Sequence, residues 1–185
     1  MMDVLGTAFL LSIVLLGIHS YFGIEIIRRG IIFTDLAVGQ MAALGAAISL
    51  MFLEGQFIYL ISLLFALIGG FLNSLAVRKV KHVEAFIGLM YAFGVAGVFI
   101  LLSKSAHGTE EFQKLLAADI LFTPMSEILK TAALFGALGI FIFFVNQRAT
   151  GILKDVLFFT TFAITITSSV RLAGVFVVFA LLIAP

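Results

Sequence analysis

Long apolar runs separated by short polar segments constrain this chain more than any other feature. A helix of about 20 apolar residues is long enough to cross a hydrocarbon core of about 30 Å. Of the residues, 63% are hydrophobic and 11% are charged, a balance that a soluble core of this size could not bury. The sequence therefore predicts an all-α, polytopic transmembrane helix bundle of about six to eight spans, forming a single domain over residues 1–185. The predicted spans are Val4–Phe22, about Ile31–Leu53, Phe57–Val77, Phe86–Leu102, Ile128–Val145 and a stretch from Val156.

The two ends of the chain need separate interpretation. The first run is too long for a cleaved signal, so we expect a retained helix. The last stretch is interrupted by Ser168–Arg171 and resumes from Leu172 to Pro185, where the chain stops inside an apolar run. We expect either an end within the membrane or a truncated copy.

Basic residues follow the odd-numbered spans, whereas the Glu54 turn and the Glu110–Glu111 loop follow even ones. By the positive-inside rule, the N-terminus is expected outside and the basic segments in the cytoplasm. Arg171 is the exception, since this order places it on the outer side or within the membrane. The basic residues are Arg28 and Arg29, which we expect to form a turn, then Arg78, Lys79 and Lys81, then Arg148 and Lys154.

The second span carries polar and small residues together. Asp35 and Gln40 are polar groups in an otherwise apolar helix, where each needs a partner or water. They are our candidates for lining a substrate path, although a helix-capping role is the alternative for Asp35. Small residues recur every fourth position and predict a close helix contact, although such residues serve plain packing in most membrane helices. They are Gly39, Ala43 and Ala47, with Ala42 and Ala46 beside them.

The segment from Ser103 to Thr123 is the longest polar stretch. Thr109 is expected to cap a short amphipathic helix at the membrane interface, and Thr123 to cap a helix that begins at Pro124. His107 with Glu110 and Glu111 allows a weak outward-facing metal site, but a solvated loop that touches a partner is the favoured interpretation.

Sequence motifs for catalysis are absent. There is no phosphate-binding glycine-lysine-serine loop, no paired metalloprotease histidines and no serine elbow. His19, His82 and His107 are scattered, and there is no cysteine. A net charge of +1 argues against a nucleic-acid partner. We expect a chain without an enzymatic activity or a bound cofactor of its own.

Four stretches, in order, resemble the permease subunits of ABC importers for zinc, manganese and iron, the ABC-3 family. They contain the paired arginines followed by a helix ending in Leu-Gly, the Ile-Gly and Tyr-Ala pattern, a Ser-Lys segment, and a late signature of a basic residue, Gly-Val and Ala-Leu-Leu-x-x-Pro. The stretches are Arg28–Gly45, Glu84–Ala92, Leu102–Leu121 and Val170–Pro185.

This resemblance implies a fold similar to type II importers such as the cobalamin permease. It implies transport by alternating access in the cell membrane, with two permease copies around a central path. Separate ATPase subunits would bind ATP and dock on the basic segments, and an extracytoplasmic metal-binding protein would deliver the ion.

The chain departs from the family in two places. Gln40 stands where the family carries a histidine, and the family aspartate position falls on Leu36, one residue after Asp35. An amide is a poor zinc ligand, so the metal ligands are unknown. The segment from Arg148 to Val156 is also shorter than in the family, and what the family carries after the final proline is missing.

Two other functions remain open. One is a degenerate permease that acts as a membrane scaffold or interaction protein without transport. The other is a secondary transporter or channel, which would need paired ionisable groups deep in the helices. The candidates for such groups are Asp35, Glu84 and Arg171.

Overall fold

The computed structural model describes residues 2–104, 110 and 120–183, and in these ranges every regular element is helical. Six helices are long and apolar enough to cross a membrane. The predicted multi-pass helical bundle is therefore confirmed. The elements are α1 (Met2–Arg29), α2 (Thr34–Leu53), α3 (Ile58–Lys79), α4 (Val83–Leu102), the 3₁₀ helix η1 (Ile120–Phe122), α6 (Met125–Arg148) and α7 (Gly151–Ile183).

Several helices extend beyond the apolar runs that predicted them. Arg28 and Arg29 lie in the last turn of α1, so the prediction that they form a turn is wrong. Likewise, α3 runs to Lys79 and α6 to Arg148. Apolar runs mark only the part of a helix inside the hydrocarbon, whereas basic side chains favour the negative C-terminal end of a helix dipole and do not interrupt it.

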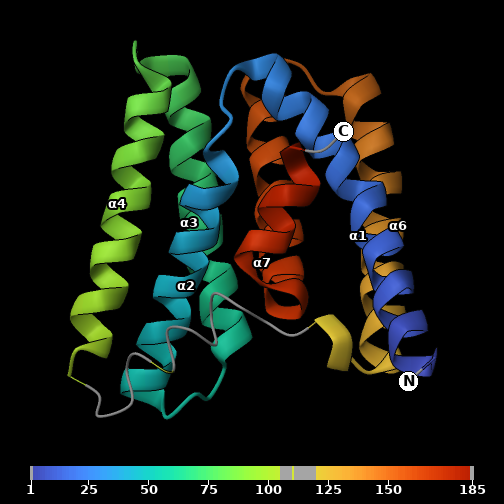
Figure 1. Cartoon of the computed structure of the whole chain (residues 1–185). Helices are drawn as coiled ribbons and strands as arrows, with labels where there is room; N and C mark the ends of the chain where they lie inside the picture. The colour runs from blue at the N-terminus through green and yellow to red at the C-terminus, as the bar shows by residue number, and fades with distance from the viewer. Residues whose placement is uncertain (1, 105–109, 111–119, 184–185) are drawn as a thin grey trace.

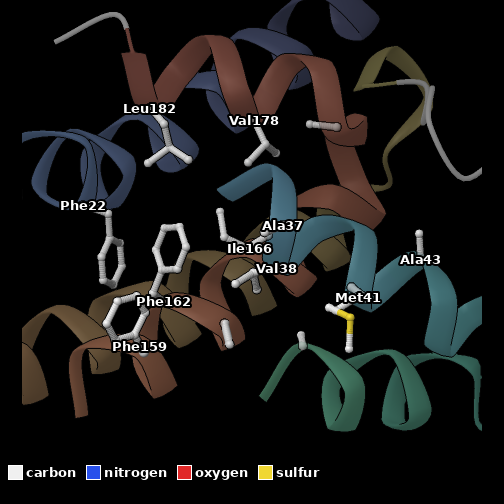
Figure 2. Packing of buried hydrophobic residues seen from close by; sticks show 14 of the residues in the cluster. Phe22, Ala37, Val38, Met41, Ala43, Phe159, Phe162, Ile166, Val178 and Leu182 are labelled. Atoms are coloured by element: carbon white, nitrogen blue, oxygen red, sulfur yellow. The ribbon is translucent and has the colours of Figure 1, made fainter. Parts of the chain in front are cut away.

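Successive long helices run in opposite directions, and α2 lies at the centre of the bundle (Figure 1). It packs against α3, α4 and α7, and most of its side chains are buried. Phe22 of α1 meets Phe158 and Phe162 of α7 edge-on, with ring centroids 5.6 and 5.2 Å apart. Figure 2 shows the rings of Phe159 and Phe162 of α7 beneath Ala37 and Val38 of α2. The core thus joins the first, second and last helices.

The closest helix approach involves a glycine that the repeating small residues did not single out. Gly39, Ala43 and Ala47 are buried, as the packing prediction requires. However, a Cβ at Gly39 would lie an ordinary 3.9 Å from Ile166, whereas one at Gly45 would lie 2.6 Å from the Ile61 carbonyl oxygen. The backbones of α2 and α3 therefore touch at Gly45.

The break in the last apolar stretch lies at Gly174, so the predicted interruption at Ser168–Arg171 is wrong. Ser169 donates its hydroxyl to the Thr165 carbonyl at 2.8 Å, which satisfies the side chain without ending the helix. Gly174 has φ 76° and ψ 164°, a conformation essentially restricted to glycine. After it the chain doubles back, as both Figure 1 and Figure 2 show.

The start of α6 also differs from the prediction. Pro124 has extended backbone and is the N-cap residue, so the helix begins at Met125, and no side chain caps it. Proline is restricted in φ but fits this flanking position as well as the first helical one. The predicted interfacial helix after Thr109, together with His107 and Glu111, lies outside the described residues.

We expect Gly174→Ala to lower the free energy of unfolding by about 1–3 kcal/mol, because a Cβ is strained in this backbone conformation. Equilibrium unfolding in mixed mild-detergent and sodium dodecyl sulfate micelles measures the change. Gly17→Ala is the control, since α1 is regular there and a Cβ would meet nothing within 4 Å. Equal stabilities of the two variants would contradict a strained reversal at Gly174.

Candidate functional site

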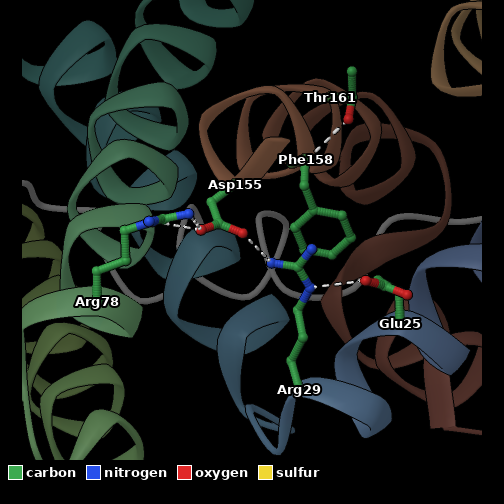
Figure 3. A network of polar contacts seen from close by, with 6 residues as sticks. All are labelled: Glu25, Arg29, Arg78, Asp155, Phe158 and Thr161. Atoms are coloured by element: carbon green, nitrogen blue, oxygen red, sulfur yellow. Dashed lines mark hydrogen bonds and ion pairs between the residues drawn. The ribbon is translucent and has the colours of Figure 1, made fainter. Parts of the chain in front are cut away.

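The helix ends that carry the basic residues meet around one carboxylate, Asp155 near the start of α7. Arg29 of α1 donates from Nη1 to Asp155 Oδ1 at 2.8 Å, and Arg78 of α3 donates from Nε to Oδ2 at 2.7 Å. Glu25 accepts from Arg29 Nε at 3.0 Å, and the Arg29 guanidinium lies 4.3 Å from the centroid of the Phe158 ring. Figure 3 shows this network, which ties together α1, α3 and α7.

The remaining basic residues belong to the helix ends and connections at the same end of the bundle (Figure 1). Arg28, Lys79, Lys81 and Arg148 are exposed, and Lys154 is half-buried. The structure therefore divides the predicted basic set into Arg29 and Arg78, which both contact Asp155, and a second group formed by the other basic residues. Charge counting over the sequence did not identify Asp155 or Glu25, and the only available signal was an acidic residue directly after Lys154.

A second polar contact at this end joins the α1–α2 connection to α4. The backbone N–H of Ile32 donates to Glu84 Oε1 at 2.7 Å. A cavity of about 560 Å³ opens beside it, and Arg29, Lys81 and His82 are among its lining residues. Glu84 Oε2 is buried without a hydrogen-bond partner among the described residues. The connections after α1 and α3 thus form one polar surface.

Asp35 and Gln40, the predicted path residues, are buried in α2, with 5% and 4% of their surfaces exposed. The N-cap residue of α2 is Phe33, and Asp35 lies in the first turn of the helix, where a carboxylate suits the positive end of the helix dipole, so the helix-end alternative for Asp35 stays open. Gln40 faces α4, because a Cβ at Gly94 would lie 2.9 Å from the Cβ of Gln40. The structure therefore places both residues inside the bundle, on its central helix.

Several buried polar atoms near this helix lack a hydrogen-bond partner in the described part of the chain. They are Asp35 Oδ1, Gln40 Oε1 and Thr34 Oγ1 in α2, and both side-chain polar atoms of Asn73 in α3. Such atoms normally bind protein groups, water or ligands, since their desolvation is unfavourable otherwise. Most of the unpartnered buried polar atoms that the structure describes therefore belong to α2 and α3.

The opposite end of the bundle carries its own ion pairs. Arg171 of α7 donates to Glu127 of α6 at 2.6 Å, and Lys130 donates to the other Glu127 oxygen at 2.8 Å. The Arg171 guanidinium lies 5.3 Å from the centroid of the Tyr59 ring, and the Tyr59 hydroxyl lies 2.9 Å from Ser168 Oγ. Arg171 thus lies at the end of the bundle opposite the basic residues, where its position in the order of spans predicted it.

The histidines do not form a metal site in the described ranges. His19 is buried in α1, donates from Nδ1 to the Leu15 carbonyl at 2.7 Å and packs near Phe135. Among residues 2–104, 110 and 120–183, no three His, Cys, Asp or Glu side chains are grouped to hold a metal ion. His19 is therefore a packed core residue of α1.

The predicted membrane orientation can be tested directly because the chain contains no cysteine. Gln56 and Lys81 are exposed at opposite ends of the bundle. We expect a membrane-impermeant maleimide to label Gln56→Cys in intact cells and Lys81→Cys only after permeabilisation, since the basic end faces the cytoplasm. The cysteine-free parent is the control, and the reverse labelling pattern would contradict this orientation.

Comparison with known proteins shows similarity at the level of fold. No protein-family model and no curated protein sequence matches the chain. One solved structure that matches is PsaBC from Streptococcus pneumoniae in complex with Fab, with a TM-score of 0.67 and 20% sequence identity. The match covers 98% of this chain and 70% of the other. Nearly every described helix therefore has a counterpart in a PsaBC-like arrangement.

Proposed function

We propose that this chain is the membrane-spanning subunit of an ABC transporter that imports a divalent metal cation. The single observation that carries the proposal is the likeness in fold to PsaBC over 98% of the chain. The four motif stretches that resemble metal ABC importer permeases support it independently. The ATP-hydrolysing subunit, a second permease copy and an extracytoplasmic binding protein are the partners this function requires.

The basic end is the proposed docking surface for the ATPase subunits. Arg28, Lys79, Lys81 and Arg148 are exposed there, around helix ends that the Asp155 network holds together. A force applied to one of these ends reaches α1, α3 and α7 together, because all three share one carboxylate. This rigidity suits a surface that must transmit the movement of an ATPase to the membrane helices.

Asp35 and Gln40 are the proposed contacts of the ion during passage. Both lie on the central helix and both have a buried side-chain oxygen without a protein partner in the described ranges. Carboxylate and amide oxygens are hard ligands, which suit manganese better than zinc. Two side chains are too few to coordinate a metal ion, so the full coordination sphere would include other groups or water.

The first experiment is purification of the tagged protein from its native membrane in mild detergent. We expect mass spectrometry to identify a P-loop ATPase in the complex, whose ATP hydrolysis depends on this chain.

In reconstituted vesicles, Asp35→Asn should lower manganese uptake at least tenfold at an unchanged amount of complex. Gln40→His should raise zinc uptake relative to manganese, because imidazole is a good zinc ligand. Ser62→Ala, another buried polar position, is the control.

The competing function is a degenerate permease that acts as a scaffold. The amide at Gln40, where the family carries a histidine, favours this alternative. A scaffold predicts stable co-purification of a partner complex whose ATP hydrolysis ignores this chain, and no metal uptake above empty vesicles. That combination of results would refute transport and support the scaffold.

A further inference from the structure

A groove of about 890 Å³ runs between α1 and α6 on the outside of the bundle. This volume is typical of sites that hold a small molecule. Most of the groove is apolar, with side chains such as Ile13, Ile18 and Phe143 on its walls. Its polar groups, in contrast, are gathered at the basic end of the bundle. The groove therefore suits an amphiphilic ligand, with an apolar chain in one part and a polar headgroup at the basic end.

Three glycines form the floor of the apolar part. Gly17 of α1 and Gly136 and Gly139 of α6 line the groove, and a Cβ at any of them would meet nothing within 4 Å. The tight contacts at Gly45 and Gly94 show that other glycines in this chain serve close helix packing. The α1–α6 glycines instead leave a hollow, which the described protein does not fill.

The polar end of the groove carries excess positive charge. Arg28, Lys154 and Gln147 line it, and neither of the two cations forms an ion pair with the described residues. Glu25 also lines this end, but its carboxylate is held by Arg29. Asp155 is likewise occupied by Arg29 and Arg78. An anion placed between Arg28 and Lys154 would therefore meet two unneutralised cations.

The spacing of the two parts matches one leaflet of a bilayer. The eleven residue steps from Gly17 to Arg28 rise about 16.5 Å along α1. Half of a hydrocarbon core is about 15 Å thick. The charged end thus lies at the membrane surface when the glycine floor lies near the bilayer centre.

We propose that this groove binds one anionic phospholipid from the leaflet at the basic end. Arg28 and Lys154 hold the phosphate, and an acyl chain lies over Gly17, Gly136 and Gly139. The inference requires only that the chain spans a membrane and does not depend on the transport function. A second copy of this chain is a poorer occupant, because copies with the same membrane orientation would bring their own cationic ends together.

The absence of tryptophan allows a direct binding measurement. Phe143→Trp places a single reporter in the groove, and Leu89→Trp places one on an exposed face of α4 at a similar distance from its helix end. The probes are brominated phosphatidylglycerol and brominated phosphatidylcholine in bilayers of matched chain length. We expect phosphatidylglycerol to quench the groove reporter at a lower mole fraction than phosphatidylcholine, and both lipids to quench the α4 reporter alike.

Two sets of variants locate the headgroup and the chain. In the Phe143→Trp background, Arg28→Gln with Lys154→Gln should weaken the preference for phosphatidylglycerol about 25-fold, at about fivefold per cation. Lys79→Gln, an exposed cation at the same end, is the control. Gly136→Leu with Gly139→Leu should abolish retention of a lipid in native mass spectra of the purified protein. Gly88→Leu, on α4 with equally open space, should retain it.

Three results would overturn the proposal. The first is equal quenching of the groove reporter by the two lipids. The second is a charge variant that behaves like Lys79→Gln. The third is a disulfide between two copies through Ile13→Cys that forms in the bilayer and removes lipid selectivity, since this result would assign the groove to a second protein copy.

Discussion

Replacing Gly45 by alanine is expected to lower the free energy of unfolding by about 3 kcal/mol, one of the largest effects of any single methyl group in this chain. The added Cβ would lie 2.6 Å from the Ile61 carbonyl oxygen and 2.9 Å from the Ser62 Cα. Both are backbone atoms, so a side-chain rotation cannot relieve the overlap and the two helices must separate. Gly45→Leu is expected to prevent assembly of α2 with α3 altogether.

Gly39→Ala is the matched control on the same helix. Its Cβ would lie 3.9 Å from Ile166, an ordinary contact, so its stability should stay within about 1 kcal/mol of the parent. Unfolding in mixed detergent and sodium dodecyl sulfate micelles measures both variants. If Gly45→Ala were as stable as Gly39→Ala, the backbones of α2 and α3 could not be in contact at Gly45.

Asp155→Asn should cost about 2–3 kcal/mol of stability, because it leaves two arginines without their shared carboxylate. The side chains of Arg29 and Asp155 are 15% and 14% exposed, so water replaces the lost contact only in part. The side chain of Arg78 is 36% exposed, so water replaces more of its lost contact and its share of the stability loss is smaller. The same unfolding experiment applies, and cysteines introduced at the ends of α1 and α3 should react faster with a maleimide when Asp155→Asn is present.

Two further variants distinguish this network from ordinary surface charge. Lys130→Gln breaks an ion pair in which Lys130 is 72% exposed, so it should change stability by less than about 1 kcal/mol. Arg78→Gln combined with Asp155→Asn should cost less than the sum of the single effects, since the two side chains share one interaction. Strict additivity would show that Asp155 and Arg78 do not interact in the folded protein.

The helices were predictable because the thickness of a membrane sets the length of an apolar run. The reversal at Gly174 was not predictable from the sequence. Gly136 and Gly139 also lie in an apolar run, yet they are helical. The difference between them comes from the packing of the segment after Gly174 against the rest of the bundle. A local pattern contains no information about that packing.

In the candidate sites, too, some features were predictable from the sequence and others depend on tertiary packing. The grouping of basic residues at one end follows from their positions after odd-numbered spans, so the sequence was sufficient. The pairing of Arg29 with Asp155 was not predictable, because the two residues are 126 positions apart and a lone aspartate beside Lys154 suggests only a local contact. For Asp35 and Gln40, the sequence indicated polar groups in a membrane helix but not which helices would enclose them.

The central position of α2 also has a consequence for synthesis. Its neighbour α7 begins at Gly151, about 98 residues after α2 ends at Leu53, and translation at about 5–20 residues per second takes about 5–20 s to cover that distance. During this interval α3 and α4 are available to cover α2, but its α7-facing side meets only lipid or the insertion machinery. The nascent bundle must therefore hold a partly polar helix in place for many seconds before its last neighbour emerges.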